Sequence, residues 1–363
     1  MPRKMLNEFD PSRDFEDSPR PPASWYSDEE FFEQERYNIF EKFWIPVARK
    51  DQLSEVGSFV SGDLLGNPWI VLNTGDGLKG YHNVCRHMGH SVAEGEGKLK
   101  SCLTCPYHGW EYNFNGDVKS VPKLGKKQNF RKQDFGLKPI AVDTWGPFVF
   151  IDMDGPFGGQ NNPRSLAGDV APLEEHLNFD GYKFFERREY HMKCNWKAFV
   201  ENSLDGGYHV AYIHENLSSG LEFEGYETHV WDRSSIQICD TNSSDDRLGE
   251  KVMYAYIYPN FFINQYGNVI DTNTIIPINA NECKVVFDFY FNYPDFDDWA
   301  TKKIMEKSVS DSHAVQLEDV DCCENVQKGM KSMSFRHGQY ASLEKAVHEF
   351  HVRLHRDMKG HID

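Results

Sequence analysis

The chain has 363 residues, which is long enough for more than one domain with a core of its own. Hydrophobic residues make up 39% and aromatic residues 14%, a globular composition, and no apolar run reaches the roughly 18 residues of a membrane span. The formal net charge of −17 argues against nucleic acid and anionic membranes as partners, and it favours a cationic substrate or a basic redox partner.

Cysteine content and the N-terminal sequence indicate the compartment. Eight cysteines in a chain of this length do not form a disulfide scaffold, so we expect reduced, mostly buried thiols. The first 22 residues have no apolar core like that of a secretory signal, and their acidic residues argue against an organellar transit peptide. We therefore expect a cytoplasmic protein, or one from another reducing compartment.

The N-terminal half is predicted to consist of an arm, a helix and a β region. Residues 1–22 are polar and rich in proline, so they are expected to be poorly ordered. Ser27 is a candidate N-cap before an acidic first turn, and the helix is predicted to continue to Phe40. Short β runs separated by glycine turns follow from about 44 to 152.

A loop rich in glycine and asparagine at 154–169 marks a domain boundary. Beyond it, 254–264 and 284–293 are rich in aromatic and β-branched residues and are predicted to be β, and the chain ends in a helix over 343–358. The expected domains are an N-terminal arm and helix at 1–43, a β domain at 44–155 and an α+β domain at 156–363.

Two cysteine–histidine pairs lie inside the β region. One is C-x-H at Cys85 and His87, and seventeen residues later comes C-x-x-H at Cys105 and His108. Two thiolates and two imidazoles on paired turns suit a [2Fe–2S] centre in which the cysteines hold one iron and the histidines the other. A Cys₂His₂ zinc knuckle usually pairs Cys with Cys and His with His. The mixed pairs therefore favour the iron–sulfur centre.

A second metal site is indicated by the spacing Asp205-x₃-His209-x₄-His214 on a predicted helix. Side chains five apart point about 140° away from each other on an ideal helix, so the two histidines converge only if the helix is interrupted. Gly206-Gly207 makes such an interruption easy. Because an electron-transfer centre needs something to reduce, we expect the two-histidine, one-carboxylate site of a non-heme Fe(II) oxygenase.

The third ligand must come from elsewhere in the fold. Asp319 is the best candidate, with Glu318 and Asp321 as competitors that spacing alone does not exclude.

With both sites located, the chain resembles the α subunits of the Rieske non-heme iron oxygenases. The matching stretches include HNVCRH, CPYHGWEYNFNG, NWKAFVENSLDGGYHVAYIH and EDVDCCENVQKG, and the likeness covers nearly the whole chain. Within the family it is most similar to choline monooxygenases and related quaternary-ammonium oxygenases. The resemblance implies an α+β protein with an N-terminal all-β Rieske domain and a C-terminal catalytic domain in which helices surround an antiparallel sheet.

The resemblance also implies the metal ligands. The cluster would be held by Cys85, His87, Cys105 and His108, and the mononuclear iron by His209, His214 and Asp319. Alignment on the Glu-x-x-Gln that begins at Glu324 favours Asp319 over its neighbours.

Two further residues receive roles from the resemblance. Asn202 would lie near the open face of the iron. An acid before the first histidine connects to a cluster histidine of a neighbouring subunit, and members of the family often place it three residues before, where this chain has Gly206. Asp205, four before, shares a helix face with His209 and takes this role, with Glu201 as the fallback.

The family further implies a homotrimer in which the cluster of one chain lies beside the iron of the next. Electrons would come from NAD(P)H through a separate reductase or ferredoxin, since no nucleotide or flavin motif is present. The expected activity is O₂-dependent hydroxylation of a small quaternary ammonium compound such as choline or a betaine. The alternatives are an aromatic acid or another N- or O-methyl compound as substrate, and, from another class, a pure electron carrier or a zinc-held binding protein.

Recognition of a trimethylammonium group would depend on aromatic rings, because such a cation has no N–H donor. The candidates are Tyr208, Tyr212, Phe261, Phe262, Tyr266, Phe287, Phe289 and Tyr290. Three histidines of the last helix, His348, His351 and His355, are expected to pack or to lie at a subunit interface rather than to bind metal.

Overall fold

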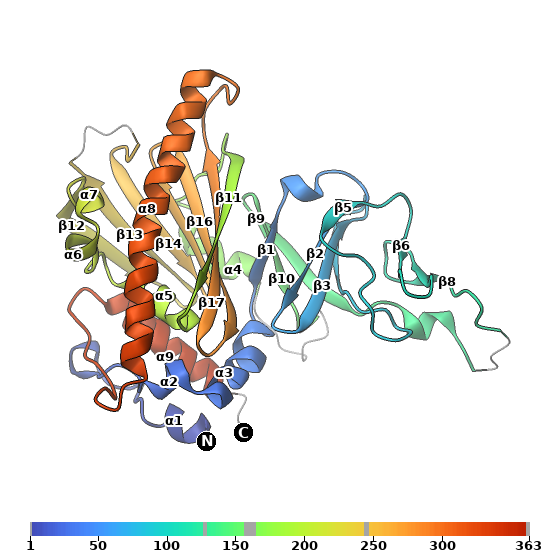
Figure 1. Ribbon diagram of the computed structural model, residues 1–363, viewed down its shortest axis with the longest axis horizontal. Helices are drawn as coiled ribbons and strands as arrows, with labels where there is room; N and C mark the ends of the chain where they lie inside the picture. The colour runs from blue at the N-terminus through green and yellow to red at the C-terminus, as the bar shows by residue number, and fades with distance from the viewer. Residues whose placement is uncertain (1, 126–128, 156–164, 243–246, 361–363) are drawn as a thin grey trace. The chain divides into compact units, whose positions relative to one another are not determined.

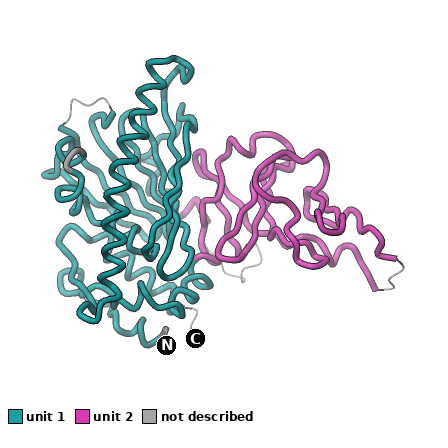
Figure 2. The backbone as a smooth tube through the Cα atoms, in the orientation of Figure 1, with its two compact units in different colours: residues 1–39, 169–363 teal, residues 40–168 magenta. Residues whose placement is uncertain are grey.

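The protein is described by a computed structural model over residues 2–125, 129–155, 165–242 and 247–360. The chain forms two compact units, one of residues 40–168 and one of residues 1–39 together with 169–363 (Figure 2). The expected α+β class is confirmed (Figure 1). The boundary predicted at 155–156 falls at 156–164, outside the described residues.

The unit of residues 40–168 is built from strands. A seven-stranded sheet has the order β1-β10-β9-β4-β3-β2-β5, and a three-stranded sheet has the order β6-β7-β8. The strands are β1 (Ile45–Arg49), β2 (Ser58–Leu64), β3 (Asn67–Asn73), β4 (Leu78–His82), β5 (Glu96–Lys98), β6 (Leu103–Thr104), β7 (Glu111–Tyr112), β8 (Val118–Ser120), β9 (Pro139–Trp145) and β10 (Phe148–Asp152). The two cysteine–histidine pairs lie in loops, one after β4 and one between β6 and β7.

The other unit has a seven-stranded antiparallel sheet in the order β11-β17-β16-β15-β14-β13-β12. Its strands are β11 (Lys183–Met192), β12 (Leu221–Val230), β13 (Ser234–Thr241), β14 (Lys251–Ile257), β15 (Phe261–Tyr266), β16 (Val269–Asn279) and β17 (Glu282–Phe291). The β stretch predicted at 254–264 is divided between β14 and β15, because Pro259 has no N–H to continue a ladder.

Helices cover one face of this sheet, where α8 crosses in front of the strands (Figure 1). Over the described residues the helices are α1 (Pro2–Leu6), α2 (Ser24–Ser27), α3 (Glu29–Glu35), α4 (Leu166–Val170), α5 (Trp196–Leu204), α6 (Val210–Ile213), α7 (Glu215–Ser218), α8 (Trp299–Met330) and α9 (Lys345–Lys359). None of them combines the length and the apolar character that crossing a membrane requires.

The N-terminal segment differs from the expectation of poor order. Leu6 and Phe9 are 2% exposed, and the Trp25 indole donates to the Met5 carbonyl at 3.1 Å. A few apolar side chains thus fix a mostly polar segment, which packs with residues 169–363 instead of forming a separate arm. The following helix begins one residue later than predicted, since the N-cap of α3 is Asp28, whose side chain accepts from the Phe31 N–H.

The three histidines of α9 are packed, as expected. His351 is fully buried between the hydroxyls of Tyr26 and Tyr340, at 3.1 and 2.7 Å, and both His348 and His355 are 4% exposed.

An ion pair in the core fixes the start of α5. Lys197 and Glu35 are both 0% exposed, and the Lys197 Nζ lies 2.6 Å from the Glu35 Oε1. The Trp196 indole donates to the other oxygen of Glu35 at 3.0 Å. Burial raises the pKa of Glu35 and lowers that of Lys197, and each charge offsets this cost for the other.

We expect Lys197→Met to lower the free energy of unfolding by about 3–5 kcal/mol, because it leaves the Glu35 carboxylate buried without a cation. Lys307→Met, which removes an exposed pair with Asp311 on α8, should cost about 1 kcal/mol or less. Urea unfolding measures both. The double substitution of Lys197→Met with Glu35→Gln should recover most of the loss, and equal losses in the two single variants would contradict this account of the core.

Candidate metal centres

The two cysteine–histidine loops have the same backbone pattern. Cys85 N donates to the carbonyl of His90 and Cys105 N to that of Trp110, each at 2.8 Å. In each loop a glycine N–H donates back to the cysteine carbonyl at 2.9 Å. These glycines, Gly89 and Gly109, have φ of 80° and 72°, a conformation that a residue with a Cβ rarely adopts. The loops are therefore two copies of one turn.

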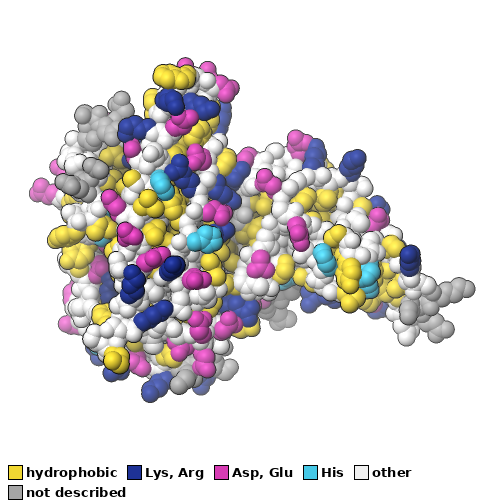
Figure 3. Space-filling view, viewed as in Figure 1, with side chains coloured by type: hydrophobic (Ala, Val, Ile, Leu, Met, Phe, Trp, Pro, Cys, Tyr) yellow, Lys and Arg dark blue, Asp and Glu magenta, His cyan; other side chains and the backbone are white. Residues whose placement is uncertain are grey.

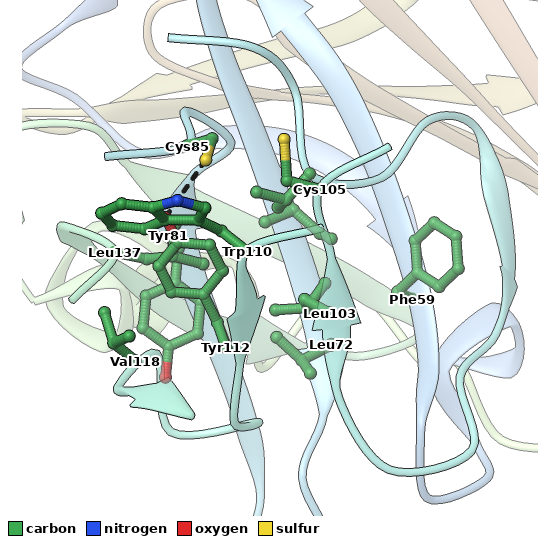
Figure 4. Close-up of a cluster of buried hydrophobic side chains, with 12 residues drawn as sticks. Phe59, Leu72, Tyr81, Cys85, Leu103, Cys105, Trp110, Tyr112, Val118 and Leu137 are labelled. Atoms are coloured by element: carbon green, nitrogen blue, oxygen red, sulfur yellow. Dashed lines mark hydrogen bonds between the residues drawn. The ribbon is translucent and has the colours of Figure 1, made fainter. Parts of the chain in front are cut away.

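The four side chains divide by burial. Cys85 and Cys105 are 2% exposed, and both sulfur atoms lie at one edge of a cluster of buried side chains (Figure 4). His87 and His108 are exposed, and histidines are visible on the surface of this unit (Figure 3). The two Nδ1 atoms are 3.1 Å apart, so the nitrogens converge on each other. A buried thiol pair and a converging imidazole pair fit the [2Fe–2S] centre.

Aromatic residues line the underside of this site. The Trp110 ring stacks on the His87 ring at 5.2 Å between centroids, with 10° between the planes. The Tyr112 hydroxyl lies 3.2 Å from the Cys85 Sγ and accepts from the Arg86 N–H at 2.9 Å. The sequence did not predict this role of Tyr112; it indicated only Gly109-Trp110, directly after His108.

The predicted interruption between Asp205 and His214 is present. Helix α5 ends at Leu204 with Asp205 as its C-cap, and Gly206 and Gly207 follow with φ of 74° and 72°. A single turn, α6, then begins, with His209 as its N-cap and His214 as its C-cap. The double glycine thus turns the chain so that both imidazoles face the same helix, α8.

The imidazoles of His209 and His214 meet the carboxylate of Asp319, which is 8% exposed. The Asp319 Oδ1 is 3.1 Å from the His214 Nε2 and 3.7 Å from the His209 Nε2. One donor atom from each of the three residues lies within 4.8 Å of the others, so together they could hold one metal ion. Asn202 Nδ2 donates to the same Oδ1 at 2.8 Å and holds the carboxylate in place.

Each imidazole is oriented by a second carboxylate. The His209 Nδ1 donates to the Asp205 Oδ2 at 2.7 Å, and the His214 Nδ1 donates to the Glu318 Oε2 at 2.6 Å. Carboxylate partners of this kind fix the tautomer of a ligating histidine and make its other nitrogen a better donor to metal. Both Nε2 atoms are thereby left for a metal ion, which is the fit expected for the two-histidine, one-carboxylate set.

The pKa of His214 is raised. Burial alone would lower this pKa, but the carboxylates of Asp319 and Glu318 stabilise the protonated ring more strongly.

The remaining candidates are Glu201 and Asp321. Glu201, the fallback for Asp205, is paired with Arg20 at 2.6 Å and with His351 at 3.1 Å. Its carboxylate is occupied inside the fold. Asp321 is exposed on α8.

A cavity of about 150 Å³ opens on the His209–His214–Asp319 group. Of the eight aromatic candidates, Tyr266 and Phe287 line it. Phe261, Phe262, Phe289 and Tyr290 are buried in the sheet, whereas Tyr208 and Tyr212 are 45% and 79% exposed.

The lining residues that sequence reasoning missed are Tyr226, Arg247, Tyr254 and Asp271. A carboxylate inside the β-branched stretch VIDTNTII (269–276) was the available signal for Asp271, because acids are rarely buried unless they are paired.

Comparisons with known proteins agree with these centres. The family "Rieske [2Fe-2S] domain" matches residues 43–134, and "Ring hydroxylating alpha subunit (catalytic domain)" matches residues 179–360. A chloroplastic choline monooxygenase of Arabidopsis thaliana is 38% identical over 98% of this chain and 87% of its own length. The carnitine monooxygenase oxygenase subunit of Escherichia coli (strain K12) is 27% identical over 87% of this chain and 85% of its own. A crystal structure of the quaternary ammonium Rieske monooxygenase CntA has the same fold, with a TM-score of 0.83 at 23% identity over 99% of both chains.

We expect Gly206→Ala to disrupt the mononuclear site. Its φ is 74°, and a Cβ there would lie 2.5 Å from the Leu343 carbonyl oxygen. The left-handed conformation alone costs roughly 1–2 kcal/mol with a Cβ present. Metal analysis and absorbance should show a loss of mononuclear iron with the [2Fe–2S] bands retained. Gly329→Ala, in the helical part of α8 with nothing near its Cβ, is the control and should retain both. Full iron content in Gly206→Ala would refute the importance of this turn.

Proposed function

This chain belongs to the Rieske non-heme iron oxygenases, and we propose that it is a monooxygenase that hydroxylates a small quaternary ammonium compound such as choline. The observation that carries the proposal is the 38% identity to a choline monooxygenase over 98% of the chain. Other choline monooxygenases, those of Beta vulgaris and Spinacia oleracea, are 35% and 36% identical over the same share of the chain.

The family's two cofactors are a Rieske [2Fe–2S] cluster and a mononuclear Fe(II) ion. We assign the cluster to Cys85, Cys105, His87 and His108, and the iron to His209, His214 and Asp319. When bound, the cluster supplies single electrons and the iron supplies the centre at which O₂ is activated. The converging Nδ1 atoms of His87 and His108 support the first assignment, and the carboxylate partners of His209 and His214 support the second.

The overall reaction places one oxygen atom of O₂ in a C–H bond of the substrate, and the other leaves as water, at the expense of two electrons and two protons. With choline the product is the hydrate of betaine aldehyde. The chain's contribution is a cavity with aromatic walls, among them Tyr226, Tyr254 and Phe287. An aromatic acid, the alternative substrate, would bring a carboxylate into a cavity lined by three aspartates, Asp205, Asp271 and Asp319, against one arginine, Arg247, so it is not favoured.

We further propose a homotrimer supplied by a separate reductase or ferredoxin. In this arrangement Asp205 connects His209 with the partner subunit's His108. In support, the Asp205 carboxylate, itself 7% exposed, accepts from the His209 Nδ1 at 2.7 Å and from the N–H of Tyr208 at 3.1 Å, and the Tyr208 side chain is 45% exposed. A solved relative is described as showing inter-subunit electron transfer.

The compartment is proposed only as a reducing one, since all eight cysteines are free of disulfide bonds. The sequence led us to expect the cytoplasm, and the relatives do not confirm this, because the plant choline monooxygenases are named as chloroplastic.

Product analysis with choline, glycine betaine, carnitine and benzoate, in the presence of a reductase, tests the function. We expect betaine aldehyde from choline and no product from benzoate. His209→Ala should abolish turnover while the cluster spectrum survives, since the two centres have separate ligands. Loss of the cluster in that variant, or hydroxylated benzoate from the wild type, would overturn the assignment.

Glu318→Gln should weaken Fe(II) binding about 10–100-fold, because it removes the charge that orients the His214 imidazole. Asp321→Asn makes the matching change on an exposed side chain of the same helix and should leave iron affinity unchanged. Titration of the iron-depleted protein with Fe(II) measures both. If the two variants bind iron equally well, Glu318 has no part in the site.

A further inference from the structure

A second carboxylate lies in the cavity, apart from the group that we assign to iron. Asp271 is 4% exposed on β16, and it lines the same cavity as His209 and Asp319. Across the sheet it is paired with Asn264 of β15, which is in turn paired with Tyr254 of β14. Residues paired in register project from the same face of a sheet, so this row forms part of the cavity wall.

The hydrogen bonds of Asp271 come from neutral groups. Asn264 Nδ2 donates to its Oδ1 at 2.7 Å, and the Tyr266 hydroxyl donates to its Oδ2 at 2.6 Å. Among the residues that the structure describes, none forms an ion pair with Asp271. Carboxylates are almost never buried without a cationic partner, because removal from water is costly for the ionised form.

Arg247 also lines the cavity, and it is connected to Asp271 only through the Tyr266 hydroxyl. Its Nη2 donates to the Tyr266 hydroxyl at 3.2 Å and to the Ser312 Oγ at 2.8 Å, and its Nε donates to the Ser308 Oγ at 3.0 Å. Burial raises the pKa of Asp271 in spite of the hydrogen bonds and of Arg247. The carboxylate is therefore incompletely compensated in the free protein.

Aromatic rings adjoin this carboxylate. Tyr254 and Phe287 line the cavity together with it, whereas the Tyr266 ring already faces the Arg247 guanidinium at 5.0 Å. A buried anion beside aromatic rings suits a cation that has no hydrogen-bond donors. The anion supplies the opposite charge and the ring faces attract the cation, and neither interaction needs an N–H group on the ligand.

We propose that Asp271 is the counter-ion of the substrate's quaternary ammonium group, in a subsite completed by the rings of Tyr254 and Phe287. This inference rests on the proposed function, and it names the residue that makes the cavity select a cationic substrate over a neutral one. Asp271 lies outside the compact His209–His214–Asp319 group, whose donor atoms are within 4.8 Å of one another, so a cation held at Asp271 is not held by the iron ligands. The uncharged part of the substrate is then the part left to reach the iron.

The test compares choline with its neutral isostere, 3,3-dimethylbutan-1-ol, which has the same shape without the charge. Binding of each to the oxidised holoenzyme is measured by titration calorimetry, without reductase, so that no turnover is involved. For the wild type we expect choline to bind roughly 10–100-fold more tightly than the isostere, from a desolvated charge pair together with cation–π contacts. In Asp271→Asn, which keeps the shape and an acceptor for Asn264, this ratio should fall to a few-fold.

Asp240→Asn is the matched control, because it removes a carboxylate from an exposed position of the same sheet that is paired with Lys251. It should keep the wild-type ratio. The cluster spectrum and the thermal unfolding midpoint report folding of each variant, and Asp271→Ser replaces Asp271→Asn if the latter does not fold. An unchanged ratio in the folded Asp271 variant overturns this inference and leaves the proposed function standing. A wild type that does not prefer choline over its isostere overturns both.

Discussion

The arrangement of the catalytic unit depends on two hydrogen bonds between carboxylates and imidazoles. Asp205 accepts from His209 and Glu318 accepts from His214, at 2.7 and 2.6 Å, and each bond leaves the opposite ring nitrogen directed at Asp319. A histidine that was free to rotate would present either nitrogen, and the three donors would not converge. Fixing both rings requires a carboxylate at the end of α5 and another on α8, so the two helices have to lie side by side.

The rest of the fold supplies that rigidity. At its start, α5 is held by the buried Lys197–Glu35 pair, and Asn195 caps it while its backbone N–H donates to Gln327 of α8 at 3.0 Å. At its end, Gln237 of β13 accepts from the Gly206 N–H at 2.9 Å and donates to the Ser203 carbonyl at 2.9 Å. The glycine turn is thus tied to the sheet whose inner face forms the cavity wall. Anchors on a sheet hold a site more precisely than a free loop would.

Much of the metal chemistry could be predicted because it is encoded by short spacings. Each cysteine–histidine pair lies within one loop, and so does most of the Asp205–His214 segment. Gly206-Gly207 indicated in the sequence that the helix is interrupted there. The choice of Asp319 needed the family resemblance, since it lies about a hundred residues away and has acidic neighbours on the same helix. Glu201 was the fallback for the role of Asp205, but its partners Arg20 and His351 come from distant segments that spacing does not reveal.

The cavity wall could not be predicted, because it depends on the register of the sheet. Tyr254, Asn264 and Asp271 come from three strands, and they share a face only through pairing that no local pattern fixes. Four of the eight aromatic candidates, Phe261, Phe262, Phe289 and Tyr290, are buried in the sheet instead, since aromatic residues also suit an ordinary β core. The order of the N-terminal segment was missed for a related reason, because isolated residues such as Phe9 leave no periodic pattern.

The central claim is that one cavity joins a cation subsite to an iron site coupled to the cluster. Single turnover tests it most directly: the dithionite-reduced, iron-loaded protein is mixed with O₂, with and without choline, and cluster absorbance and product are followed together. We expect cluster oxidation that is accelerated by choline and accompanied by the formation of betaine aldehyde. Cluster oxidation at the same rate without choline, with no betaine aldehyde formed, would contradict it.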